Sequence, residues 1–347
     1  MSVGPRGYIT YFDQRYLPRA LVMLRSLRRH DPEARVFPLC FDALAFDVVS
    51  SLADPMIAPI EAAALIAFEP RLPDCAERGR WAFYATHKPL LPLYVFAQHP
   101  ELAALAHIDA DTWFFAAPAP LYAELGDASV GLSPHRLSPP YEHYEVYGKF
   151  NAGFIYWRHD ETALRCLEDY RADCLSWCYN RVEPDGRYMN QGYLTTWPDR
   201  YPNVHVLQHP GANLAFWNIA RHHLAEKPSL TADGEPVVFY HFSNLYQDRN
   251  RVWRTQYAGL GPQHRLVLRA LYHPYLSEIE KTDRQLRCRW PGMLPIDPQQ
   301  QPWLETMPAL RAYSRLSEKI VSALRRPGRV KRFLRFYKSV LHRTYGG

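Results

Sequence analysis

The stretch LAHIDADTWFF, residues 105–115, places two carboxylates directly after an apolar segment that is typical of a buried strand. In an extended chain the side chains of residues i and i+2 lie on the same side, so Asp109 and Asp111 are expected to share one face at the end of this strand. Two unpaired like charges so close together repel each other, and a hard divalent cation between them removes the repulsion. The stretch therefore predicts a metal site at the carboxyl end of a strand.

Strands and helices alternate in the N-terminal part of the chain. Residues 7–12, 35–41 and 56–60 have the composition of strands, whereas a segment with Pro18 in its first turn and residues 61–68 have the periodicity of helices. Such alternation is expected for a parallel sheet that helices cover on both faces. The order of elements therefore indicates an α/β fold.

The pattern continues past residue 80 with less regular spacing. Residues 83–98 have a helical apolar periodicity that Pro89 and Pro92 interrupt, and Pro89 is a suitable first residue for the helix proper. We therefore expect a mixed, mainly parallel sheet flanked by helices. The later elements are predicted as strands at 129–135, 151–157, 204–209 and 237–242 and as a helix at 160–178.

The composition, with 47% hydrophobic and 14% aromatic residues among 347, is sufficient for a large core. No apolar leader follows Met1, and no uncharged run approaches the roughly 20 residues of a membrane span, so a cytosolic protein is expected. The six cysteines are scattered, which argues against a disulfide framework. Cys174 and Cys178 lie one helical turn apart, and helix packing explains them better than a metal site.

The C-terminal end differs in charge from the rest of the chain. Residues 290–302 have the composition of a linker, so we expect a domain at 1–300 and a basic amphipathic helical tail at 301–347. Residues 311–347 contain eight Arg and three Lys against one Glu, a net charge of +10, whereas the whole chain carries +6 and the residues before them therefore −4. Binding to an anionic membrane surface is the favoured interpretation, ahead of packing on the protein's own domain. Nucleic-acid contact is disfavoured, because no nucleic-acid module is recognisable.

Polar side chains recur where the predicted strands end. In open parallel sheets ligands bind beyond the carboxyl ends of the strands, so these residues are expected to meet at one edge. Together they describe a site for a metal and a nucleoside diphosphate. They are Tyr11, Asp13 and Tyr16 after the first strand, Asp109 and Asp111 after the middle one, Asn151 and Gly153 with the segment NAGF, and His241 with Asn244 near the last strand.

Each of these signals has a simpler alternative. An Asp-x-Asp sequence is often a solvated turn or a helix cap, and a lone histidine such as His241 is usually a hydrogen-bonded structural residue. A phosphatase with an aspartyl nucleophile also has Asp-x-Asp after an apolar strand. That interpretation is disfavoured, because Trp113 stands where such enzymes need Thr or Val and because the motif lies far from the first strand.

The ordered set of segments resembles the GT-A glycosyltransferases, in particular bacterial surface-polysaccharide and lipopolysaccharide transferases and, more distantly, the glycogenin-like retaining enzymes. The resemblance covers most of residues 7–244 and implies the GT-A (Rossmann-like) fold for the domain. The segments are YITYFDQRYLPRALVMLRSLRRHDP, THKPLLPLYVF, LAHIDADTWFF, KFNAGFIYWR, MNQGYL, HPGANLAFWN and VVFYHFSN.

The resemblance implies roles for particular positions. Asp109 and Asp111 match the motif that binds Mn²⁺ or Mg²⁺ on the donor diphosphate, and His241 is similar to the histidine that completes the coordination. Lys88 is placed to meet phosphate or a donor hydroxyl, or else is a solvated residue at a helix start. Tyr11, Asp13 and Tyr16 match the position of the base and ribose, Asn151 and Gly153 that of the donor sugar, and Asn213 and Trp217 a sugar-binding group, for which burial of Trp217 in the core is the alternative.

The segment MNQGYL departs from the family pattern. Relatives commonly have Asp before Gln, whereas this chain has Asn190 before Gln191, and an amide cannot act as a base. An inverting enzyme would need Asp185 or Glu183 in its place, so the resemblance favours a retaining mechanism with Gln191 near the anomeric carbon. The alternative is that Asn190 and Gln191 only cap the helix that follows.

The expected function is metal-dependent transfer of a sugar from a nucleotide sugar, with uridine as the preferred base by analogy, to a cell-envelope glycan or lipid-linked acceptor. The resemblance implies catalytic roles for Gln191, Asn190 and Asn151. The tyrosine-rich stretch at 141–150 is expected to form a lid or an acceptor wall. The tail would hold the enzyme at the inner face of the membrane. The alternative is a catalytically inactive glycosyltransferase-like protein that binds a glycan or scaffolds a membrane assembly.

Overall fold

The computed structural model describes residues 5–247, 253–257, 259 and 262–296. The chain divides into two compact units, the first comprising Met1–Ser243 and Pro262–Pro295 and the second Asn244–Gly261 and Ile296–Gly347. In the second unit the described strands are β14 (Tyr246–Gln247) and β15 (Trp253–Arg254), which pair antiparallel. The predicted tail, residues 301–347, lies outside the described residues.

The first unit is built on a seven-stranded sheet with the order β3-β2-β1-β4-β7-β6-β8. The strands β3, β2, β1 and β4 are parallel, β7 runs antiparallel to both β4 and β6, and β6 is parallel to β8. The mixed, mainly parallel sheet expected from the sequence is therefore confirmed. The bounds are β1 (Arg6–Phe12), β2 (Arg35–Cys40), β3 (Ile60–Glu61), β4 (Ala104–Ile108), β6 (Val130–Pro134), β7 (Phe150–Arg158) and β8 (Val204–Val206).

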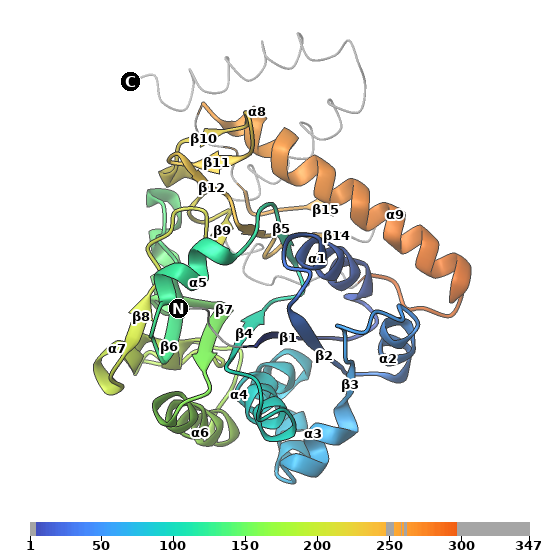
Figure 1. Cartoon of the computed structure of the whole chain (residues 1–347), viewed down its shortest axis with the longest axis vertical. Coiled ribbons are helices and arrows are strands. Elements are labelled where there is room, and N and C mark those ends of the chain that lie inside the picture. Colours follow the sequence, from blue (N-terminus) through green and yellow to red (C-terminus); the bar gives the residue numbers. More distant parts are fainter. Residues whose placement is uncertain (1–4, 248–252, 258, 260–261, 297–347) are drawn as a thin grey trace. The chain divides into compact units, whose positions relative to one another are not determined.

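Helices cover both faces of this sheet (Figure 1). Neighbouring residues of β1, β4 and β7 belong to different apolar layers. On one side Tyr8 and Ala106 pack with α1 (Leu17–His30), α2 (Ala43–Ser50), α5 (Ala119–Leu125) and α9 (His273–Arg289). On the other side Ile9 and Leu105 pack with α3 (Ala62–Phe68), α4 (Arg80–Gln98), α6 (Glu161–Ser176) and α7 (Trp197–Arg200). The two apolar layers fix the sheet between them.

Two smaller sheets complete the first unit. The strand β13 (Phe239–His241) pairs antiparallel with β5 (Thr112–Phe114) and parallel with β9 (Leu214–Ala215), and β10, β11 and β12 form a separate antiparallel sheet. The register of β13 sets His241 opposite Thr112, directly after the Asp-x-Asp motif. Further elements are β10 (Leu224–Ala225), β11 (Thr231–Ala232), β12 (Glu235–Pro236), α8 (His264–Val267), the π-helical turn Leu268–Tyr272, and 3₁₀ turns at Leu72–Arg78, Pro139–Tyr147, Gly192–Thr196 and Ile219–Arg221.

The prediction that Pro89 opens its helix is wrong, because α4 begins at Arg80 and continues through Pro89 and Pro92. A proline inside a helix lacks the N–H that would bond to the carbonyl four residues earlier, which for Pro89 is the carbonyl of Ala85. The side-chain amide of Asn190 donates to that carbonyl at 3.0 Å. The helix therefore tolerates Pro89 because a side chain from another segment replaces the missing donor.

Candidate active site

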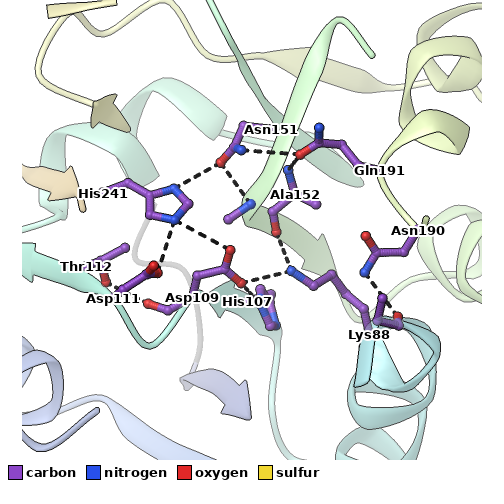
Figure 2. Close-up of polar contacts among 12 residues, drawn as sticks. Lys88, His107, Asp109, Asp111, Thr112, Asn151, Ala152, Asn190, Gln191 and His241 are labelled. Carbon is purple, nitrogen blue, oxygen red and sulfur yellow. Dashed lines mark hydrogen bonds and ion pairs between the residues drawn. The ribbon is translucent and has the colours of Figure 1, made fainter. Parts of the chain in front are cut away.

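Three side chains that could ligate a cation meet at the carboxyl end of β4. Asp109 and Asp111 lie in the turn between β4 and β5, where the hydroxyl of Thr112 donates to the carbonyl of Asp109 at 2.9 Å. His241 Nε2 lies 3.1 Å from Asp111 Oδ1 and 3.7 Å from Asp109 Oδ2 (Figure 2). One ligand atom from each of the three residues lies within 4.8 Å of the others. The register of β13 against β5 thus joins residues that are far apart in the sequence.

Asp109 Oδ1, the carboxylate oxygen farther from His241, contacts two buried side chains. Lys88 Nζ lies 2.9 Å from Asp109 Oδ1 and also donates to the carbonyl of Ala152 at 2.7 Å, and His107 Nε2 lies 2.9 Å from the same oxygen. The side chain of Lys88 is only 3% exposed, so the alternative of a solvated helix start is wrong. With Oδ1 occupied, Oδ2 is the oxygen of Asp109 that faces His241.

His107 was not singled out by the sequence analysis. It lies in β4, two residues before Asp109 and therefore on the same side of the chain. A histidine at a central position of an otherwise apolar strand was the available signal, because a buried imidazole requires a polar partner.

The electrostatics of this cluster follow from burial and from the Lys88 ammonium. Burial raises the pKa of Asp109, but Lys88 and His107 outweigh it and hold the pKa well below its usual range. Burial, assisted by Lys88, lowers the pKa of His107 to about 4, so its neutral ring donates from Nε2 to Asp109. Burial also lowers the pKa of His241, but Asp111 and Asp109 more than offset it and the pKa is raised. The two carboxylates therefore favour the protonated form of His241.

Asn151 and Gln191 form the wall beside this cluster. Asn151 and Gly153 lie near the start of β7, not at the end of a strand as predicted, and reach the site because β7 runs antiparallel to β4. Gln191 comes from a different segment, directly before the 3₁₀ turn Gly192–Thr196. Asn151 Oδ1 accepts from the backbone N–H of Gly153 at 3.0 Å and lies 3.2 Å from His241 Nδ1, and its Nδ2 donates to Gln191 Oε1 at 3.3 Å. Asn190, by contrast, points to α4, where it bonds Ala85.

Gly153, Asn213 and Trp217 lie around the same imidazole. A Cβ atom at Gly153 would come within 2.6 Å of both His241 Cε1 and Asn151 Oδ1, so the absence of a side chain there admits His241. The ring of Trp217 meets the imidazole edge to face at 5.5 Å, and Asn213 Nδ2 donates to Asn151 Oδ1 at 3.2 Å. Trp217 is 4% exposed, which agrees with the alternative interpretation that it is a buried core residue.

The residues at and after the end of β1 contact α4. The Tyr11 ring is 5.2 Å from the His107 ring and 5.4 Å from Lys88 Nζ. Asp13 accepts from the hydroxyl of Tyr84 at 3.2 Å, and Tyr84 stacks on Phe41 at 3.8 Å. The Tyr16 ring lies 6.0 Å from the ring of Trp81. This aromatic group, which consists of Phe41 after β2 and of Trp81 and Tyr84 in α4, was not predicted, because nothing in its spacing distinguishes it from core residues.

The donor set suits a hard divalent cation. Two carboxylates provide the oxygen ligands that Mg²⁺ and Mn²⁺ prefer, and an imidazole nitrogen is compatible with Mn²⁺. The three ligand atoms lie close together, and Lys88 and His107 orient Asp109 through contacts with its Oδ1.

Within the described ranges, no helix has both the length and the apolar character that crossing a membrane requires.

Among the solved structures that match this chain are two glycosyltransferases. A galactosyltransferase LgtC, crystallised with donor and acceptor sugar analogs, is 17% identical with a TM-score of 0.46 over 71% of this chain and 90% of its own. The apo form of the glycosyltransferase GlyE of Streptococcus pneumoniae TIGR4 is 11% identical with a TM-score of 0.48 over 81% of this chain and 64% of its own.

Comparison of sequences identifies relatives that cover most of this chain. No protein-family model matches the chain. The uncharacterized protein YfnD of Bacillus subtilis (strain 168) is 25% identical over 292 residues, which cover 82% of this chain and 92% of YfnD. The uncharacterized protein YfnF of the same organism is 31% identical over 246 residues, which cover 68% of this chain and 80% of YfnF. On this relationship, the chain belongs to the same family as Bacillus subtilis YfnF.

Proposed function

We propose that the protein is a GT-A glycosyltransferase that moves a sugar from a nucleotide-diphosphate sugar and requires Mn²⁺ or Mg²⁺. The observation that supports this function most strongly is the convergence of Asp109, Asp111 and His241 at the carboxyl end of β4. An open α/β sheet binds its ligands at that edge. The bound cation would supply Lewis acidity toward the diphosphate leaving group.

The residues around the cluster divide into those that hold the cation and those that hold the donor. Asp109 would bind through Oδ2, because Lys88 and His107 occupy Oδ1. Tyr11, Asp13 and Tyr16 would contact the base and ribose, and the stack of Phe41 and Tyr84 beside Asp13 supports a base at that position. Asn213 and Trp217 would contact the donor sugar, since Asn213 Oδ1 and Trp217 Nε1 are buried without a hydrogen-bond partner among the described residues.

A retaining outcome is the better supported stereochemistry. The amide of Asn190 is engaged with the carbonyl of Ala85, so it offers no carboxylate and no free group for proton abstraction. The two acids that could replace it pair with arginines of their own loop, Asp185 with Arg187 and Glu183 with Arg181. Gln191 lies in the wall of the site, where an amide can face the donor sugar.

The acceptor is proposed to be a glycan or a lipid-linked saccharide of the cell envelope. The tyrosine-rich turn Pro139–Tyr147 borders the site, because the carbonyl of Tyr147 accepts from Gln191 Nε2 at 2.9 Å. The rings of Tyr147 and Tyr188 lie 4.7 Å apart and suit a sugar face. Residues 311–347, with their charge of +10, would hold the enzyme on an anionic cytoplasmic membrane surface.

The direct test is calorimetry with UDP in the presence and absence of Mn²⁺, followed by a thermal-shift panel of nucleotide sugars. A ligand that binds the folded state raises its apparent stability, so the true donor should raise the melting temperature only with the cation. Asp111→Asn should abolish this stabilisation while leaving the fold intact. The absence of UDP and Mn²⁺ binding would refute the enzyme and favour the inactive, glycan-binding alternative.

A further inference from the structure

The amides of Asn151 and Gln191 are oriented by backbone groups whose hydrogen-bonding roles cannot change. The N–H of Gly153 can only donate, so the Asn151 atom that faces it at 3.0 Å must be the oxygen. The N–H of Ala152 likewise fixes Gln191 Oε1 at 3.0 Å, and the carbonyl of Tyr147 fixes Gln191 Nε2 at 2.9 Å. Gln191 Oε1 then accepts from Asn151 Nδ2, which agrees with the first assignment.

These orientations determine where His241 carries its proton. His241 Nδ1 lies 3.2 Å from Asn151 Oδ1, and a carbonyl oxygen can only accept, so Nδ1 must be the donor. The other ring nitrogen, Nε2, faces Asp111 Oδ1 and Asp109 Oδ2. A half-turn of the ring would put Cδ2 and Cε1 where Nδ1 and Nε2 lie and would remove both polar contacts, and Gly153 and the edge-to-face ring of Trp217 lie close to the ring as it stands.

We infer that Asn151 is a positioning residue that keeps the proton of His241 on Nδ1 and so leaves the lone pair of Nε2 for the cation. Gln191 supports this role by holding Asn151 in one orientation. With the proton held on Nδ1 and hydrogen-bonded to Asn151 Oδ1, the Nε2 lone pair would be the one that a bound cation could use. This inference rests on the proposed function and gives Asn151 a role through His241 instead of direct contact with the donor sugar.

The test compares two substitutions at the same position. Asn151→Ala removes the acceptor, whereas Asn151→Asp keeps an oxygen where Oδ1 lies. Loss of a hydrogen bond that orients a metal-bound histidine typically costs about 10- to 100-fold in metal affinity. We therefore expect Asn151→Ala to weaken Mn²⁺ binding by that factor in calorimetry without nucleotide, and Asn151→Asp to restore most of it. Gln208→Ala is the control, because it removes an exposed amide that donates to the carbonyl of Val206, and its Mn²⁺ affinity should match the wild type.

A spectroscopic measurement separates positioning from a general loss of structure. In the Mg²⁺ complex of protein labelled with ¹⁵N-histidine, His241 should carry its proton on Nδ1 in the wild type and in Asn151→Asp, with a signal protected from exchange. That protection should be lost in Asn151→Ala. A proton on Nε2 in the wild-type complex, or wild-type Mn²⁺ affinity in folded Asn151→Ala, would overturn the inference.

The inference and the proposed function can fail separately. If the wild-type protein binds neither Mn²⁺ nor Mg²⁺, the proposed function is refuted, and the spectrum of the metal-free protein at neutral pH still tests the hydrogen bond. An Nδ1 proton that is protected in the wild type and exposed in Asn151→Ala would support the role of Asn151. Equal protection in both proteins would contradict it.

Discussion

Replacement of Lys88 by methionine is expected to destabilise the protein and to make its stability depend on Mn²⁺. Lys88→Met keeps the length and packing of the side chain but removes the charge 2.9 Å from Asp109 Oδ1 and the donor to the carbonyl of Ala152. Breaking a buried ion pair by removing one partner costs about 3–5 kcal/mol. Because the side chain of Asp109 remains 28% exposed, water compensates part of the loss, and we expect a value near the lower limit, about 3 kcal/mol.

The cation should reverse much of this loss. The metal-free variant lacks the positive charge of Lys88 next to Asp109 and Asp111. A bound divalent cation therefore relieves more repulsion between these carboxylates in the variant than in the wild type. Urea unfolding with and without saturating Mn²⁺ measures both free energies of unfolding. Lys149→Met is the matched control, because this lysine is exposed and its loss should change stability by no more than about 0.5 kcal/mol. A loss for Lys88→Met below about 1 kcal/mol, or one that Mn²⁺ does not reduce, would refute the reasoning.

Three further outcomes are expected. Gly153→Ala should lower Mn²⁺ affinity at least as much as His241→Ala, because a Cβ there would lie 2.6 Å from His241 Cε1; calorimetry of both variants checks this, and unchanged binding would place His241 elsewhere. Because the pKa of His241 is raised and the cation competes with its proton, Mn²⁺ affinity should increase with pH until His241 is neutral and then level off, which titrations across neutral pH would measure. The stability that the raised pKa gives the metal-free protein is fully present below about pH 6.5 and is lost as the pH rises through the folded-state pKa; urea unfolding should show this loss in the wild type and not in His241→Ala.

Much of the fold was predictable because the apolar periodicity is local. The strand before Asp109 and the helix that starts near Pro18 follow from a few neighbouring residues, and the structure has both as β4 and α1. The start of α4 was not predictable. Its passage through Pro89 depends on an amide from Asn190, a residue about a hundred positions later, and no local pattern records that contact.

The candidate site was predictable to the extent that its residues follow strands. Asp109, Asp111 and His241 were proposed together from their positions, and the structure brings them into one group. The direction of β7 was missed, since an antiparallel strand inside a parallel sheet has the same apolar composition as its neighbours. His107 was missed because the segment before Asp109 was treated as uniformly apolar, although it contains one polar residue.

The pairing of β13 with β5 has a consequence for how the protein matures on the ribosome. His241 can reach the turn after β4 only when the chain has been synthesised past Phe242, whose N–H bonds to the carbonyl of Asp111 at 2.8 Å. A nascent chain that ends earlier holds two acids without their third ligand. If the proposed cation binds there, its full set of three ligands would therefore exist only in chains that extend past Phe242.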